Sequence, residues 1–268
     1  MRHPFFEVDH PIVIGHRGAG GEHPENTLPS FEAALAQGAA ILESDVHRTR
    51  DGVPILLHDP TLERLCGVPA AAADLTWAEI ARLDAGVGFV AADGSRPFAG
   101  RGIRIASLEQ AFAQFPDARF NLEIKCAGPE LLRETLDLVA RHGRAERTLL
   151  TAGEDPIMAD LRRMVSASGL APALGASLAD VLAVIASALE GRPMPRDVMA
   201  LQIPATFAGR PLVTPALVDH AHAHGVEVHV WTINALPEIE ALLDLGVDGI
   251  VTDFPGRMAR WLADGHRP

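Results

Sequence analysis

The chain has 268 residues, 48% of them hydrophobic, which is enough to bury the core of one large α/β domain. Its 23 basic and 35 acidic residues give a formal charge of −12, and no basic stripe is present for binding nucleic acid. We therefore expect no nucleic-acid partner, and an anionic substrate has to be attracted locally. The two cysteines, Cys66 and Cys126, are too few for a disulfide scaffold and lack metal-ligand spacing.

The N-terminal segment, Met1–His10, contains no apolar run long enough for a signal peptide. No stretch of the chain approaches the 18 or so consecutive apolar residues of a membrane-spanning helix. We therefore expect a cytoplasmic protein without a transmembrane segment. An export signal that had already been removed would leave no trace in this sequence.

Apolar runs typical of buried strands alternate with helix-like segments along most of the chain. The eight predicted strands are Ile12–His16, Ile41–Val46, Arg119–Lys125, Thr148–Thr151, Pro172–Ala176, Val198–Ile203, Glu227–Thr232 and Gly249–Asp253. Helices are expected near Thr27–Gln37, Leu108–Phe115, Pro129–His142, Pro156–Ser166, Leu178–Leu189, Thr214–His224 and Pro237–Leu245. This alternation predicts an α/β fold, a parallel (β/α)8 TIM barrel. An open doubly wound sheet is the alternative, but no glycine-rich strand-to-helix fingerprint supports it.

A ninth apolar run, Val53–Leu57, follows the strand ending at Val46 too closely for a parallel crossover. We expect a β-hairpin instead, with Asp51-Gly52 as its turn. Counting back from that turn places His58 beside Asp45. The hairpin therefore brings a histidine to the level of an acidic side chain.

Residues 60–106 carry little of the barrel pattern. We expect them to form a small inserted subdomain at the C-terminal rim of a single domain spanning residues 1–268, with a short helix around Trp77–Leu83. The segment 86–90 and Phe98 could line a substrate entrance or could simply connect other elements, and the sequence favours neither.

Two predicted strands carry charges where a barrel core needs apolar side chains. Side chains two positions apart on a strand share a face, so Glu43 lies with Asp45 and Glu123 lies with Lys125. Buried charges are costly unless they are paired or bind a metal. Lys125 is also the only lysine of the chain, which indicates that a compact point charge is needed at this position. These strands predict a site for a cation and an anionic ligand.

Active sites of such barrels lie at the C-terminal ends of the strands. The three carboxylates of Glu43, Asp45 and Glu123 would repel one another there unless a divalent cation were bound. Oxygen ligands favour Mg²⁺ or Ca²⁺ over zinc. We therefore expect one divalent cation, and the sequence does not choose between the two.

The neighbouring residues suit phosphate chemistry. Arg17 and Lys125 would supply positive charge to an anion at the cation, and a phosphate fits this role. His16 and His58 form a suitable acid–base pair near neutral pH. Trp231 ends the seventh predicted strand and either contacts the substrate or fills the mouth of the barrel.

An ordered set of motifs connects these residues. It comprises His16-Arg17-Gly18, Pro24-Glu-Asn-Thr27, Glu43-x-Asp45, Asp51-Gly52, His58-Asp59, Glu123-x-Lys125, Trp231-Thr-x-Asn234 and Gly249-Ile-Val-Thr-Asp253-x-Pro255. From residue 11 to about residue 260, the set resembles the glycerophosphodiester phosphodiesterase family. The resemblance implies a distorted barrel with an insertion after His58. It also implies a divalent cation held by Glu43, Asp45 and Glu123, with His16 and His58 as the catalytic pair.

The resemblance further implies hydrolysis of glycerophosphodiesters to an alcohol and sn-glycerol 3-phosphate. A lysophospholipase D-like or sphingomyelinase D-like reaction on lipid phosphodiesters, through a cyclic phosphate, is the alternative, and its apolar mouth would come from the insertion. A non-catalytic barrel that binds phosphate esters is a third class, which the intact motif residues argue against. The head group, the roles of the two histidines and the oligomeric state stay open.

Other polar residues have simpler interpretations. Glu25 and Asn26 resemble substrate contacts, but the segment Pro24–Thr27 precedes a helix and is assigned to its cap, with Asn26 or Thr27 at the start. Asp253 is expected to hold Arg17. The charged run 144–147 and the histidines of the 220–229 region are assigned to solvated surface, since the histidines lack an acidic metal-ligand partner.

Overall fold

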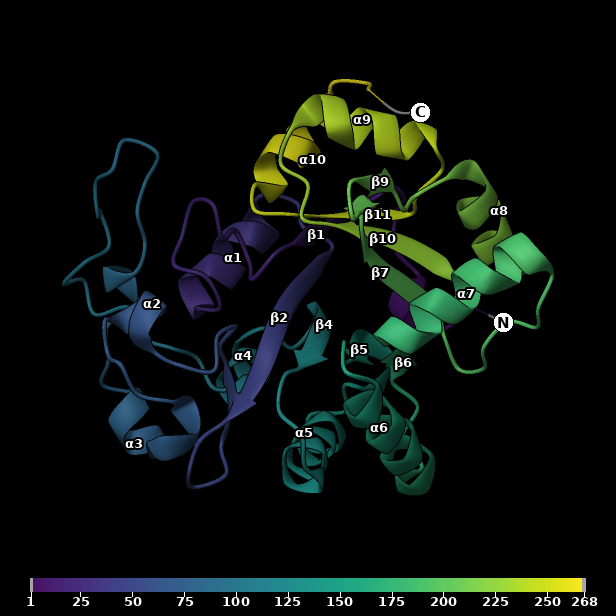
Figure 1. Cartoon of the computed structure of the whole chain (residues 1–268). Coiled ribbons are helices and arrows are strands. Elements are labelled where there is room, and N and C mark those ends of the chain that lie inside the picture. The colour runs from purple at the N-terminus through teal and green to yellow at the C-terminus, as the bar shows by residue number, and fades with distance from the viewer. Residues whose placement is uncertain (1, 267–268) are drawn as a thin grey trace.

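The computed structural model describes residues 2–266 and shows eight parallel strands enclosed by helices (Figure 1). Their order in the sheet is β6 (Ala173–Leu174), β5 (Thr148–Thr151), β4 (Arg119–Ile124), β2 (Ile41–Arg48), β1 (Ile12–Gly15), β11 (Gly249–Thr252), β10 (Glu227–Trp231) and β7 (Ala200–Pro204). The Met199 N–H donates to the Leu174 carbonyl at 3.0 Å and joins the two ends of this order. The predicted (β/α)8 barrel is confirmed, and the open doubly wound sheet is wrong.

All seven predicted helices are present. They are α1 (Leu28–Ala36), α4 (Leu108–Gln114), α5 (Pro129–Arg141), α6 (Asp155–Ser168), α7 (Leu178–Glu190), α8 (Pro215–Ala223) and α9 (Leu236–Asp244). The sequence patterns missed helix α10 (Pro255–Ala263), which follows the last strand, and the short hairpin of β8 (Thr206–Phe207) and β9 (Arg210–Pro211). The two hairpin strands are too short to show an apolar period, whereas helix α10 has an amphipathic pattern that the predicted elements left out.

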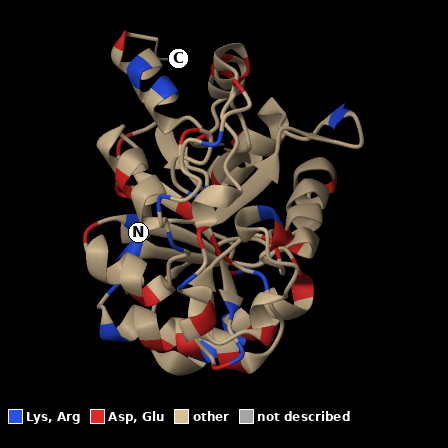
Figure 2. Cartoon of the chain, turned by 90° about the vertical axis from the view of Figure 1, so that its left-hand side faces the viewer, with Lys and Arg blue, Asp and Glu red and all other residues tan. Residues whose placement is uncertain are grey.

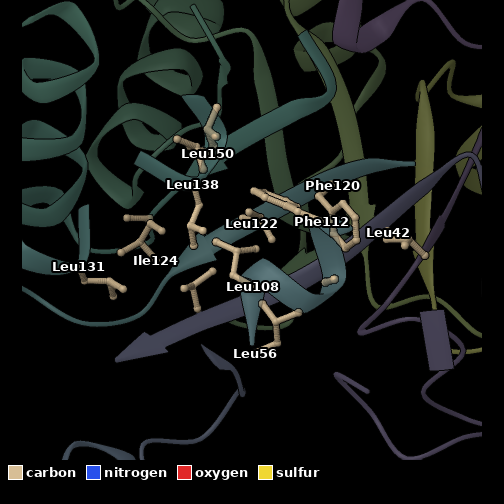
Figure 3. Close-up of a cluster of buried hydrophobic side chains, with 14 of the residues drawn as sticks. Leu42, Leu56, Leu108, Phe112, Phe120, Leu122, Ile124, Leu131, Leu138 and Leu150 are labelled. Carbon is tan, nitrogen blue, oxygen red and sulfur yellow. The ribbon is translucent and has the colours of Figure 1, made fainter. Parts of the chain in front are cut away.

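The alternation of side chains along the strands produces two packed layers. On the outer side of β2, β4 and β5, Leu42, Phe120 and Leu122 pack against helices α4 and α5 (Figure 3). Inside the barrel, the apolar side chains near the start of the strands form a separate cluster with Phe5 and Phe6 of the short helix η1 (Pro4–Phe6). This lower core is mainly apolar, with the buried pair of Glu227 and His229 beside it, and the cavity lies in the upper half of the barrel interior.

The β-hairpin is present, but its predicted register is wrong by one residue. Strand β3 (Pro54–Leu56) pairs with β2 so that Leu56 lies opposite Val46, and the Leu57 N–H donates to the Asp45 carbonyl at 3.0 Å. The loop has three residues instead of two, since the Thr49 N–H donates to the Val53 carbonyl. Gly52 lies in this loop with φ +92°, a conformation that glycine adopts readily.

The inserted segment contains two short helices, α2 (Glu63–Cys66) and α3 (Trp77–Ile80), and two 3-10 turns, η2 (Ala72–Asp74) and η3 (Ala85–Val87). Helices α2 and α3 lie to one side of the barrel (Figure 1). Apolar side chains of the segment form their own cluster with residues of the hairpin. The insertion is therefore anchored to strand β3, which ends two residues before His58. The predicted helix around Trp77–Leu83 is shorter than expected.

Charged residues are distributed over the outer helices. In Figure 2, basic and acidic segments are interspersed on the face in view, without a continuous basic stripe. Within residues 2–266, no helix has the length and apolar character needed to cross a lipid bilayer.

One assignment of charged residues to the surface is wrong. Arg144 is 1% exposed, and its guanidinium donates to the carbonyls of Phe115, Pro116 and Ala118. Its guanidinium carbon also lies 4.6 Å from the ring centroid of Phe112. Burial lowers the pKa of Arg144 to about 10, so the side chain remains charged at neutral pH. Arg144 therefore holds the loop between α4 and β4 in place through buried hydrogen bonds.

We expect Arg144→Met to destabilise the protein by about 2–4 kcal/mol, because buried carbonyls lose their donor and a cavity forms beside the aromatic rings. The matched control is Arg147→Met in the same charged run. Since the Arg147 side chain is 46% exposed, its loss should change stability by no more than about 0.5 kcal/mol. Urea denaturation monitored by circular dichroism measures both, and equal midpoints would contradict the structural role.

Candidate active site

The upper half of the barrel contains a cavity of about 420 Å³. All eight predicted site residues line it, namely His16, Arg17, Glu43, Asp45, His58, Glu123, Lys125 and Trp231. They come from the ends of β1, β2, β4 and β10 and from the hairpin, which are distant in sequence. The structure thus brings together every residue selected from the sequence, and the individual roles remain predictions.

The ammonium group of Lys125 lies between two carboxylates. Its Nζ is 3.0 Å from Asp45 Oδ1 and 2.7 Å from Glu123 Oε2. The register of β2 and β4 places Asp45 directly beside Glu123, so both carboxylates lie on the inner face at one level. Burial lowers the pKa of Lys125, but the two carboxylates outweigh this effect and raise it overall. Lys125 is therefore a permanent cation at the centre of the site.

Asp45 is almost completely enclosed, with a side chain that is 2% exposed. Its Oδ2 accepts a hydrogen bond from the Asn26 amide at 3.2 Å and lies 3.4 Å from Arg17 Nε. Asn26 is itself fully buried and accepts from the Ser44 hydroxyl at 2.6 Å. Of the two capping residues that the sequence offered, Thr27 provides the cap by accepting from the Ser30 N–H. The side chain of Asn26 holds Asp45 and does not cap the helix.

Among the three carboxylates, the negative charge of Glu43 is the least well offset by neighbouring groups. Its Oε2 accepts from the Arg17 main-chain N–H at 3.0 Å, and His16 Nε2 is 4.0 Å away. Burial, together with the charge of Asp45, raises the pKa of Glu43 to about 7. A buried acid of this kind indicates that the site can accommodate another positive charge.

The positions of the three carboxylates can be compared with those needed to bind the predicted divalent cation. The donor set of three carboxylates suits a hard divalent cation, and the raised pKa of Glu43 fits a missing positive charge. In the present side-chain positions, no three His, Cys, Asp or Glu residues within 2–266 are grouped closely enough to hold an ion. The chemistry of the donors fits a cation, and the ligand set of Glu43, Asp45 and Glu123 stays a prediction.

Each of the two histidines is oriented by an aspartate. The Nδ1–H of His16 donates to Asp253 Oδ1 at 2.7 Å, and that of His58 donates to Asp59 Oδ1 at 2.7 Å. With Nδ1 engaged, each ring leaves Nε2 free for proton transfer. The prediction that Asp253 holds Arg17 is therefore wrong: its carboxylate bonds His16 and, through Oδ2, the Asn234 amide at 2.7 Å.

Arg17 bonds a different acid. Its Nη1 donates to Glu25 Oε1 at 2.9 Å, so Glu25 is an ion-pair partner and not a capping residue. Among the polar atoms of buried residues, Arg17 Nε lacks a hydrogen-bond partner within the protein, although it lies near Asp45. The guanidinium thus contacts two carboxylates, those of Glu25 and Asp45, and also lines the cavity.

The sequence did not identify the polar residues deeper in the cavity. Asn121 lies two positions before Glu123 on β4, and Gln202 lies on β7. The Asn121 Oδ1 and both amide atoms of Gln202 are shielded from solvent and have no partner within the protein. Shielded amides without partners are costly. The shared-face rule that selected Glu123 and Lys125 would also have selected Asn121.

The sequence left open whether segment 86–90 and Phe98 line a substrate entrance or only connect other elements. Among the described residues that line the cavity, none belongs to this segment or is Phe98, which favours the connecting role. Trp231 lines the cavity and is 44% exposed, and Phe207, on the hairpin that follows β7, is 65% exposed. The exposed aromatic side chain at the cavity is therefore that of Trp231, at the end of β10.

The histidines of the 220–229 region do not gather into a site. His222 bonds Asp248 at 2.8 Å on the surface, and His220 bonds the Ser187 hydroxyl at 2.8 Å. His229 is 1% exposed and bonds Glu227 at 3.0 Å inside the barrel, so its assignment to solvated surface is wrong. A strand position facing the barrel interior explains the burial.

Known proteins resemble this chain in sequence and in fold. Residues 16–257 match the model of the glycerophosphoryl diester phosphodiesterase family. A Mycobacterium tuberculosis protein named "Probable glycerophosphodiester phosphodiesterase 2" is 31% identical over 245 residues, covering 90% of this chain and 87% of that protein. Human lysophospholipase D GDPD1 is 29% identical over 276 residues, covering 93% and 85%. A Silicibacter pomeroyi crystal structure, of a candidate glycerophosphoryl diester phosphodiesterase, has TM-score 0.77 and 30% identity, covering 98% and 97%.

The hydrogen bond from His16 to Asp253 affects the pKa of His16, which can be measured. Burial lowers the pKa of His16, but the hydrogen bond to Asp253 and the charge of Glu43 raise it above 6.5 overall. The imidazolium therefore stabilises the folded protein fully below pH 6.5, and this contribution is lost as pH rises through the raised pKa. We expect Asp253→Asn to lower the pKa of His16 in an NMR titration.

Asp248→Asn is the matched control, because it removes the same kind of bond from His222. It should leave the pKa of His16 unchanged. A His16 that titrates identically in wild type and Asp253→Asn would show that the aspartate does not stabilise the imidazolium.

Proposed function

Because this chain belongs to the glycerophosphoryl diester phosphodiesterase family, we propose that it hydrolyses glycerophosphodiesters to an alcohol and sn-glycerol 3-phosphate, with a bound divalent cation. The observation that carries the proposal is the convergence of eight residues on one cavity. They include two aspartate-oriented imidazoles and two cationic side chains. This set supplies what cleavage of an anionic ester at phosphorus requires.

The cationic side chains bind the phosphate in this proposal. Arg17 brings a guanidinium group to the wall of the cavity, and Lys125 supplies a fixed ammonium group. Donors held in place before the reaction stabilise the charge that develops on the phosphate oxygens. When bound, a divalent cation on Glu43, Asp45 and Glu123 would offset further negative charge on a phosphate oxygen. Mg²⁺ and Ca²⁺ both suit these ligands.

The two histidines transfer the protons. Asp253 and Asp59 hold the Nδ1–H of His16 and His58, so the Nε2 atoms are the reactive ones. One Nε2 accepts the proton of the attacking water or substrate hydroxyl, and the other donates a proton to the departing alcohol. Both rings are fixed in tautomer and orientation, as proton transfer requires.

The deep part of the cavity supports a substrate that carries hydroxyl groups. The unpartnered amide atoms of Asn121 and Gln202 include donors and acceptors. A glycerol moiety placed toward them would offer the complementary groups once the amides rotate to meet it. The departing alcohol would then lie toward Trp231 at the mouth.

A second candidate is lysophospholipase D activity. It is favoured by the human relative of that name and by the exposed side chain of Trp231, which lines the cavity. An acyl chain could contact this side chain at the mouth. Phosphorus NMR of the products from glycerophosphocholine and from lysophosphatidylcholine separates the two candidates, since the proposed function requires faster turnover of glycerophosphocholine. It also detects a cyclic phosphate product.

We expect His16→Ala and His58→Ala each to lower kcat for glycerophosphocholine about 10²–10⁴-fold, the usual contribution of a general acid or base. His222→Ala is the control, because His222 lies on the surface. Release of glycerol 3-phosphate, followed by a coupled dehydrogenase assay, measures all three. Near-normal turnover by either active-site variant would remove that histidine from the mechanism.

A further inference from the structure

Arg64 connects the insertion to the active site. It lies on α2, the first helix of the insertion, and did not stand out in the sequence. Its Nη1 and Nη2 donate to the two oxygens of Glu25, each at 2.7 Å, and its Nε donates to Asp59 Oδ2 at 2.6 Å. One guanidinium therefore binds two carboxylates that come from different loops of the barrel.

Each of these carboxylates also holds a side chain that lines the cavity. The second oxygen of Asp59 accepts from His58 Nδ1 at 2.7 Å. Glu25 Oε1 accepts from Arg17 Nη1 at 2.9 Å. The chain of contacts runs from His58 through Asp59, Arg64 and Glu25 to Arg17.

We propose that Arg64 is a positioning residue that fixes the imidazole of His58 relative to the guanidinium of Arg17. The inference rests on the proposed function, in which His58 transfers a proton and Arg17 binds the phosphate. Arg64 does not line the cavity, so it acts only through Asp59 and Glu25.

The three hydrogen bonds of Arg64 support this role more strongly than a single ion pair on the surface would. The Arg64 side chain is 47% exposed, and a single ion pair at such a site contributes little. Here, however, the planar fork binds Glu25 through two parallel bonds, an arrangement that lysine cannot reproduce. The bond from Arg64, followed by that from His58, lowers the pKa of Asp59 to about 2. The aspartate therefore stays an acceptor for His58 at all pH values of interest.

Loss of Arg64 would release both carboxylates from their common anchor. Asp59 would keep His58 but lose the bond that fixes its plane, and Glu25 would keep Arg17 but could rotate with it. A displacement of about 1 Å at a reacting group can lower a rate about 10²-fold. The insertion would then influence catalysis without contacting the substrate.

The first experiment compares Arg64→Ala with Arg101→Ala, which removes an exposed arginine of the same insertion. With glycerophosphocholine, we expect Arg64→Ala to lower kcat about 10–100-fold, the usual cost of losing a residue that orients an active-site group. Arg101→Ala should retain wild-type turnover. Arg64→Lys keeps the charge without the fork and should fall between them, and it carries the test if Arg64→Ala does not fold.

A double-mutant cycle distinguishes positioning from a general effect on the fold. If Arg64 acts through Asp59 and Glu25, Arg64→Ala should lower kcat much less in the Asp59→Asn and Glu25→Gln backgrounds than in wild type. Full, multiplicative losses in both backgrounds would overturn the proposal. Wild-type kcat in both Arg64 variants would overturn it as well.

The wild-type protein separates this inference from the proposed function. If it cleaves bis(4-nitrophenyl) phosphate but not glycerophosphocholine, the proposed substrate is wrong, and the same cycle is measured with the chromogenic ester. Non-additive losses with that ester would still support the positioning role, and multiplicative losses would contradict it. A protein that cleaves neither ester contradicts both the function and the inference.

Discussion

Repulsion among buried carboxylates is the constraint on which the site depends. Asp45 and Glu123 lie side by side on neighbouring strands, and Glu43 lies on the same face of β2. The enclosed Asp45 is tolerable because the Lys125 ammonium, the Arg17 guanidinium and the Asn26 amide surround it. Glu43 has only the Arg17 main-chain N–H at 3.0 Å and His16 at 4.0 Å, and burial beside Asp45 raises its pKa to about 7. The site therefore holds more acid than its own cations neutralise.

The surrounding structure concentrates this charge in one place. The lower half of the barrel is filled mainly by apolar side chains, including Phe5 and Phe6, while the cavity and the polar residues that line it lie at the opposite end. Loops beyond the strands then supply the remaining acids: Asp253 and Asp59 orient the two imidazoles, while Glu25 holds Arg17. Arg64 joins two of these acids and thereby ties the insertion to the catalytic groups.

The periodicity of the strands in the sequence predicted which site residues share a face of the sheet. Charges at positions i and i+2 in Glu43–Asp45 and Glu123–Lys125 fixed their shared face, and a hairpin too short for a crossover brought His58 to them. It could not predict the partners chosen in three dimensions. Asp253 was given the wrong partner, and Arg144 was assigned to the surface, because a pattern does not show which carboxylate or carbonyl will lie within reach. Arg64 and Gln202 carry no local signal, and their roles depend on loops and strands distant in sequence.

The most direct measurement is a Mn²⁺ titration followed by the EPR signal of the free ion, in wild type and in Glu43→Gln. Glu240→Gln, at an exposed position, is the control. Binding at the three carboxylates predicts one ion per chain, competition by Mg²⁺ or Ca²⁺, and affinity at least about tenfold weaker in Glu43→Gln only. Absence of binding, or equal affinity in all three proteins, would contradict the account.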